Sequence, residues 1–258
     1  MSIFKSGNPT LSEKIFTRSL NAEQEMNGTM SVRGTINKFG FMLIMVLAGA
    51  TYTWYLYENS VNQLNVIPYL WGGLIGGFIT ALIIIFKPAW SPYLAPAYGI
   101  LEGLFLGAIS VIVNDAFRES HPGIVMQAVG LTFCVAIVMF LLYNFRIIRP
   151  TQKFKAILLV ATASIALFYL VLWVMRIFGA YPGFMELGDN SLLGYGISFF
   201  IVAIAALNLI LDFERIETGA DMGAPRYMEW YCAFGLMVTI VWLYIEILRL
   251  LSRFNSRN

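Results

Sequence analysis

Residues 192–213 read LLGYGISFFIVAIAALNLILDF, an apolar stretch in which Asp212 is the one charged residue. A helix of this length rises about 33 Å, which is enough to cross a hydrocarbon core roughly 30 Å thick. The stretch lacks the alternation of apolar and polar residues that a membrane β-strand shows. It therefore predicts a membrane-spanning helix with an acidic residue near one end.

Six further stretches of similar character surround this one. The chain has 258 residues, of which 59% are hydrophobic and 12% charged, whereas about a quarter are charged in a soluble domain. We therefore predict an all-α integral membrane protein, a bundle of seven transmembrane helices that occupies residues 39–251. A polar cytoplasmic segment, residues 1–38, would precede it, and a short tail, residues 252–258, would follow. The expected spans lie near residues 39–57, 69–86, 93–113, 124–145, 156–178, 192–213 and 228–251.

The distribution of Lys and Arg predicts a cytoplasmic N-terminus. Basic residues are frequent in the N-terminal segment and in the fourth and sixth connections, whereas the first, third and fifth connections hold only Arg118 and Arg176. Seven spans would then place the basic C-terminal end outside, against this rule. Either the basic residues of the early loops set the orientation, which we favour, or the last segment does not fully cross the membrane. The first 38 residues contain no apolar core before a cleavage site, which argues against a cleaved signal peptide.

Several classes of function are disfavoured by what the chain contains. The net charge of +2 is too small to indicate a nucleic-acid partner. Cys134, Cys232 and His121 form no metal-binding pattern, so no resident cofactor is expected. No HExxH, P-loop or GxSxG motif occurs, and we do not expect an enzyme.

Small residues recur at helical spacing in the second and third spans. In lipid, such positions let helix backbones approach closely, and packing is the expected role. The glycines concerned are Gly72, Gly73, Gly76, Gly77, Gly99, Gly103 and Gly107.

Glu102, Asp212 and Glu246 lie within apolar spans. A charged side chain near the bilayer centre costs roughly 2.5–3.5 kcal/mol, so these residues are expected to face the protein interior and to line an ion or proton path. Glu102 has no basic residue within a helical turn, which predicts either a partner on another helix or a protonated carboxyl group. Asp212 and Glu246 each have an arginine at i+3, and a local ion pair is the alternative for both.

A second acid near Asp212 is expected on the last helix. If the sixth helix ends near Thr218 and the seventh begins near Pro225, Asp212 lies level with about residue 231, close to Glu229. Glu246 would then lie some 20 Å further along the helix. Asp212 and Glu229 together could share a proton or bind Ca²⁺ through their oxygens. Lys87, at the cytoplasmic end of the second span, could pair with either acid and close the path, or it could be a membrane-interface anchor.

Three segments resemble the Bax inhibitor-1 family in its bacterial branch, and the similarity extends from about Thr35 onward. They are Glu102-Gly-Leu-Phe-Leu-Gly107, Leu211-Asp-Phe-Glu-Arg-Ile216 and Leu243-Tyr-Ile-Glu246 with Arg249 downstream. The resemblance implies a bacterial cell membrane and a bundle whose last helix is surrounded by the others. It also implies a pH-sensitive Ca²⁺ leak controlled by two acids, on the sixth and seventh helices.

The resemblance also implies roles for single residues. Asp212 matches the first acid of the family. For the second, the Leu-Tyr-x-acid motif indicates Glu246, whereas alignment on Arg249 places Thr239 at that position. Lys87 occupies the region in which family members can carry an arginine that latches onto the first acid.

Two hypotheses of function follow. The first is a passive cation leak, most simply for Ca²⁺ or protons, that is gated by protonation of the intramembrane carboxylates. The second is a regulatory membrane protein without transport activity, which binds and restrains a membrane protease or another partner. For this role the N-terminal segment offers Leu11, Ile15 and Phe16 on one face of a helix.

Overall fold

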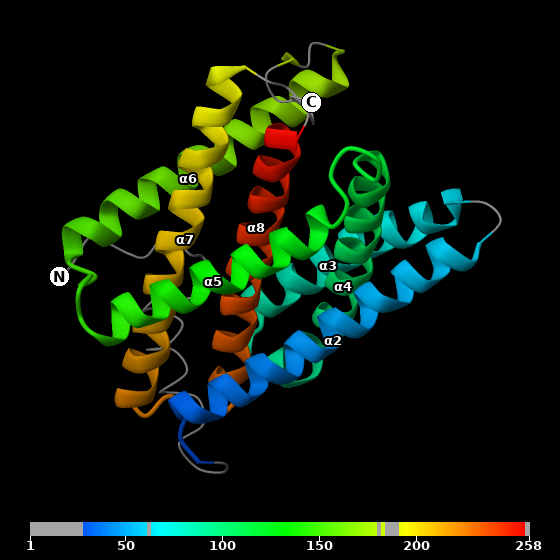
Figure 1. Cartoon of the computed structure of the whole chain (residues 1–258). Coiled ribbons are helices and arrows are strands. Elements are labelled where there is room, and N and C mark those ends of the chain that lie inside the picture. Colours follow the sequence, from blue (N-terminus) through cyan, green and yellow to red (C-terminus); the bar gives the residue numbers. More distant parts are fainter. Residues whose placement is uncertain (1–27, 61–62, 180–181, 184–190, 256–258) are drawn as a thin grey trace. The chain divides into compact units, whose positions relative to one another are not determined.

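The computed structural model describes residues 28–60, 63–179, 182–183 and 191–255. This part of the chain consists of helices joined by short connections (Figure 1). Seven of its helices are long and apolar enough to cross a membrane, which confirms the predicted all-α, multi-pass fold. They are α2 (Val32–Asn59), α3 (Ile67–Phe86), α4 (Ser91–Ala116), α5 (Ile124–Asn144), α6 (Gln152–Ile177), α7 (Leu192–Asp221) and α8 (Met228–Asn255), with short 3₁₀ helices η2 (Gln63–Val66) and η3 (Pro88–Trp90) between them.

The first and last helices are longer than their apolar stretches. Ser31 caps α2 because its side chain accepts a hydrogen bond from the Gly34 N–H at 2.9 Å, so the helix begins at Val32. Residues 32–38 of the polar N-terminal segment are therefore helical. At the other end α8 continues to Asn255, and residues 252–255 extend the helix. The predicted docking face of Leu11, Ile15 and Phe16 lies outside the described residues.

The connection between α7 and α8 differs from the expected one. Helix α7 passes through Gly219 and ends at Asp221, because Gly223 adopts a left-handed conformation with φ of 65°. The Gly223 N–H donates to the Ala220 carbonyl and the Ala224 N–H to the Gly219 carbonyl, the pattern of a glycine-terminated helix. Since α7 ends later than Thr218 and α8 begins at Met228, the register of the two helices shifts from the expected one.

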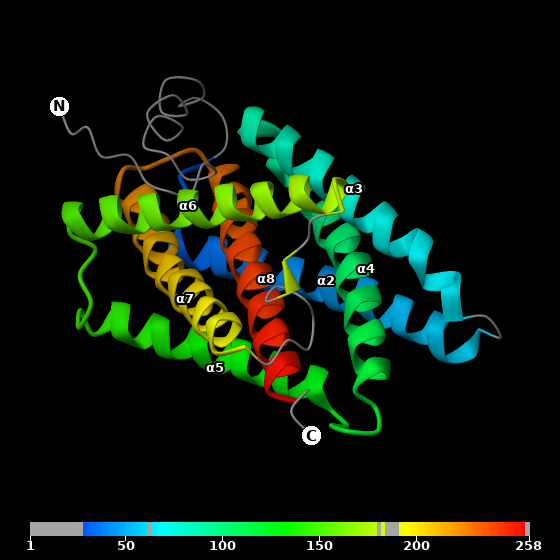
Figure 2. The same ribbon diagram turned by 90° about the horizontal axis from the view of Figure 1, so that it is seen from above.

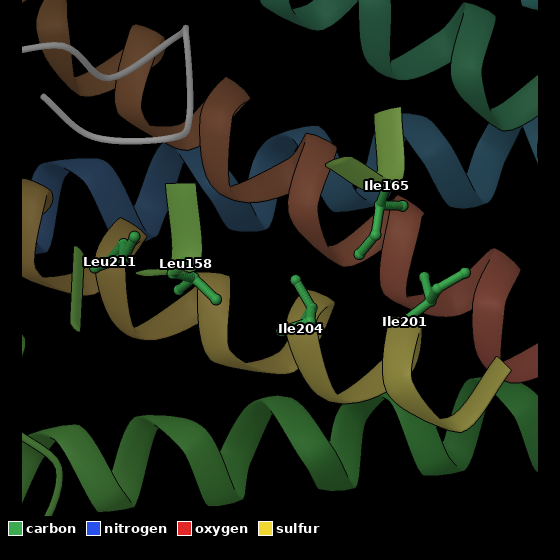
Figure 3. Packing of buried hydrophobic residues seen from close by; sticks show 5 residues of the cluster. All are labelled: Leu158, Ile165, Ile201, Ile204 and Leu211. Carbon is green, nitrogen blue, oxygen red and sulfur yellow. The ribbon is translucent and has the colours of Figure 1, made fainter. Parts of the chain in front are cut away.

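The chain forms two compact units. Among the described residues, one unit contains 116–213 and 239–255, and the other contains 28–115 and 214–238. Helices α7 and α8 thus supply residues to both. In the first unit Leu158 and Ile165 of α6 meet three residues of α7 in a buried cluster (Figure 3). The α7 residues are Ile201, Ile204 and Leu211.

In the second unit glycines bring α4 against α2 and α3 (Figure 2). A Cβ on Gly73 of α3 would lie 2.6 Å from the Leu101 carbonyl oxygen of α4. On Gly103 of α4, a Cβ would overlap the backbone of Val46 on α2. Gly73 and Gly103 therefore have the predicted role, which is to let helix backbones touch.

Helix α8 is the most enclosed span. In its most apolar window 67% of the residues are buried, against 17–22% for α2, α3, α5 and α6. The expectation that the other helices surround the last one stays a prediction. The burial of α8 explains how a helix with two acidic residues, Glu229 and Glu246, can lie within an apolar protein, because protein groups bind both carboxylates.

Candidate functional site

Asp212 lies in the first unit and joins α7 to α8. Its side chain is fully buried, and its Oδ2 accepts a hydrogen bond of 2.5 Å from the Thr239 hydroxyl. Thr239 is itself buried. The contact ties the two most buried helices together through one titratable group.

Asn208 precedes Asp212 by one helical turn and extends this polar face toward α6. Its amide nitrogen donates to the Thr162 hydroxyl at 2.9 Å and to the Ile204 carbonyl at 2.8 Å. The i, i+4 spacing places Asn208 and Asp212 on one face of the helix. The structure shows that this face presents polar groups to α6 and to α8.

Glu246 lies further along α8 than Thr239, in the same unit, and two side chains bind its carboxylate. Arg249 forms an ion pair with it at 3.2 Å, so the local i+3 pair predicted from the sequence is present. The Tyr169 hydroxyl of α6 donates to the same carboxylate at 2.8 Å. Arg249 also donates to the Tyr169 hydroxyl and lies over its ring, 5.2 Å from the centroid. Tyr169 was not expected from the sequence, since it is 77 residues away.

Glu102 lies on α4 in the second unit. It interacts with the Tyr98 hydroxyl one turn earlier on the same helix. Its carboxyl group lies against Gly77 of α3, where a Cβ would come within 3.0 Å of Oε2. The Tyr98 ring in turn packs edge-on against Phe234 of α8, with centroids 4.9 Å apart. Tyr98 and Glu102 are spaced i, i+4, so their contact could have been predicted from the sequence, but we did not predict it.

Glu229 is the first acid of α8, in the second unit, and it binds the beginning of α2. It forms an ion pair with Lys38 and accepts hydrogen bonds of 2.9 Å from both the Ser31 N–H and the Ser31 hydroxyl. Only 3% of Glu229 is exposed. Gly34 leaves room for the carboxylate, because a Cβ at that position would overlap it. We call Glu229, Lys38 and Ser31 the α2–α8 clasp.

The register that suggested residue 231 as the neighbour of Asp212 is wrong. Asp212 lies nine residues before the end of α7, and the ninth residue after the start of α8 is Met237. Thr239 is accordingly the α8 residue that bonds to Asp212. Glu229 lies ten residues earlier on α8, which corresponds to about 15 Å along the helix.

Ca²⁺ binding by Asp212 and Glu229 stays a prediction. The described residues contain no group of three or more His, Cys, Asp and Glu side chains placed to hold a metal ion. Each of the two acids has its own partner from another helix, Thr239 for Asp212 and Lys38 for Glu229.

Lys87 forms the end of α3 and stacks on an aromatic ring. Its Nζ lies 4.3 Å from the centroid of the Trp90 ring, a cation–π contact within the second unit. A contact of this kind suits a basic residue at the membrane interface. Its role as a latch for Asp212 stays a prediction.

Comparison with known proteins agrees with this architecture. A family model described as Bax inhibitor 1 like matches residues 8–256. No individually curated protein matches the chain. The family match covers all seven membrane-spanning helices, and the family is generally not enzymatic. The chain is therefore a multi-pass integral membrane protein that belongs to the Bax inhibitor 1 like family.

Proposed function

We propose that the chain is a passive, pH-sensitive leak for Ca²⁺, in which protonation of Asp212 controls opening. The observation that supports this function is the buried hydrogen bond from Thr239 on α8 to Asp212 on α7. A titratable group that holds two enclosed helices together converts a change of charge into a change of packing. In this proposal the chain lies in a bacterial inner membrane with its N-terminus in the cytoplasm, where the Lys and Arg of its early connections are favoured.

The sign of the pH response follows from the nature of the bond. A hydroxyl that donates to a carboxylate ion makes a bond roughly twice as strong as one to a neutral acceptor. Protonation of Asp212 therefore weakens the α7–α8 contact, and the leak increases as the pH falls. Carboxylate oxygens are also the ligands that Ca²⁺ prefers along a path.

Neutralisation of Asp212 tests this function directly. In proteoliposomes loaded with a Ca²⁺ indicator, wild-type influx is expected to rise as the pH is lowered from 8 to 6. The Asp212→Asn protein cannot titrate at this position, so its influx is expected to be the same at both pH values. An Asp212→Asn protein with the wild-type pH profile would contradict the proposal.

Asp221→Asn is the matched control, because Asp221 lies on the same helix and is exposed. This variant is expected to keep the wild-type pH profile. If wild-type protein passes no Ca²⁺ at any pH, the leak is excluded, and regulation of a partner protein becomes the function to test.

Thr239 is expected to set the pH at which the leak opens. Thr239→Val keeps the shape of the side chain but removes the donor, so the ionised form of Asp212 loses a bond worth about 1.5–3 kcal/mol. The midpoint of the influx profile should then move to higher pH by about one unit or more. Thr239→Ser retains a hydroxyl and should restore the wild-type midpoint. If Val and Ser shift the midpoint equally, the hydroxyl has no part in the response.

A further inference from the structure

A groove with a volume of about 600 Å³ lies at the beginnings of α2 and α8, entirely within the second unit. Its lining combines three kinds of group: basic side chains, aromatic rings and the polar first turn of α2. The residues used below are Asn37, Lys38, Phe41, Arg226, Glu229 and Trp230.

The groove lies where two spans enter the membrane. Both α2 and α8 begin beside it, and the apolar part of α2 begins only at Phe39. Trp230 packs edge-on against Phe41, with ring centroids 5.9 Å apart. Tryptophan and other aromatic residues concentrate at the level of the lipid headgroups. A molecule in this groove would therefore lie at headgroup depth, beside the hydrocarbon layer.

The charges of the groove leave one cation available. Lys38 is already engaged by Glu229, which also accepts two hydrogen bonds from Ser31. Arg226 is exposed in the connection before α8, and its guanidinium group forms no ion pair among the described residues. With Lys38 and Arg226 positive and Glu229 negative, the groove carries a net charge of +1. Arginine binds phosphate oxygens through two parallel hydrogen bonds, which makes it well suited to a phosphate ligand.

We propose that this groove binds the phosphodiester headgroup of an anionic phospholipid, with Arg226 as its principal ligand. A phosphodiester carries one negative charge, which matches the net charge of the groove, and its acyl chains would extend along the apolar surface below. Asn37 also lines the groove and can supply an amide donor, and the ring of Trp230 can serve as an apolar wall. The site is independent of Asp212 and of the proposed leak.

The test measures lipid binding to the full-length, detergent-solubilised protein by native mass spectrometry. Phosphatidylglycerol and phosphatidylcholine with the same acyl chains serve as anionic and zwitterionic probes. We expect wild-type protein to prefer phosphatidylglycerol, and Arg226→Gln to weaken that binding about tenfold, in line with the loss of one charge-assisted contact. Binding of phosphatidylcholine should be the same in both proteins.

Arg33→Gln is the matched control, since Arg33 is exposed on the first turn of α2, outside the groove lining. It removes the same charge and should leave phosphatidylglycerol binding unchanged. Lys38 is not used as a test position, because its loss would also break the α2–α8 clasp.

Two results would overturn the proposal. The first is an equal loss of phosphatidylglycerol binding in Arg226→Gln and Arg33→Gln, or no loss in either, because binding would then not depend on this groove. The second is displacement of the bound lipid by millimolar inorganic phosphate in wild-type protein but not in Arg226→Gln. That result would identify a site for free phosphate in place of a lipid site.

Discussion

Glu229→Ala is expected to destabilise the protein by about 3 kcal/mol, the lower end of the range for removing one member of a buried ion pair. The substitution leaves Lys38 without its acid in a site where only 17% of the lysine side chain is exposed. It also leaves the Ser31 N–H and hydroxyl without their acceptor at the start of α2. Titration with sodium dodecyl sulfate in mixed micelles, followed by far-UV circular dichroism, measures the free energy of unfolding.

A second variant separates loss of the ion pair from general disruption. Glu229→Met combined with Lys38→Met replaces the pair by two apolar side chains of similar size. Such replacements are often neutral or stabilising, so the double variant should recover the part of the lost stability that comes from the unpaired Lys38. If it is as unstable as Glu229→Ala, the charge pair is not what the clasp contributes.

Gly103→Leu is expected to cost about 3 kcal/mol or more in the same assay, since overpacking a tight contact typically costs 1–3 kcal/mol and occasionally more. The clash involves the Cβ itself, which would overlap the Val46 backbone on α2, so no side-chain rotamer relieves it. The two helices would have to separate, and their other close contacts would be lost with them.

Gly72→Leu is the control for this prediction. A Cβ on Gly72 meets no atom within 4 Å, so its substitution should leave stability unchanged or raise it slightly through better helix propensity. Equal destabilisation by both substitutions would show that close backbone contact at Gly103 is not the cause.

The contrast between these glycines shows how far spacing can predict packing. Gly72 and Gly73 are adjacent in the sequence, and both were expected to be packing positions. Only Gly73 meets a neighbouring backbone, because adjacent residues on a helix point about 100° apart and one helix face can be occupied while the next is open. The pattern identified the helices that approach closely but not the glycine that permits each contact.

In the candidate site, too, the sequence predicts some contacts and not others. The ion pair of Glu246 and Arg249 could be predicted from the sequence, because helical geometry places residues i and i+3 next to each other. The contact of Asp212 with Thr239 could not be predicted, since it depends on where α7 ends. Passage through Gly219 and termination at Gly223 moved the register of α8 by several residues. Local signals near a helix end are too similar for sequence alone to choose between two nearby glycines.

The sequence by itself determined the seven helices and their membrane setting. In lipid a backbone must satisfy its hydrogen bonds internally, so each apolar stretch of about 20 residues has one stable conformation. Only the tertiary structure decided which groups meet the buried acids: Thr239 for Asp212, Tyr169 for Glu246, and Lys38 with Ser31 for Glu229. These partners come from separate helices, and the register and rotation of packed helices depend on many weak contacts that no single segment encodes.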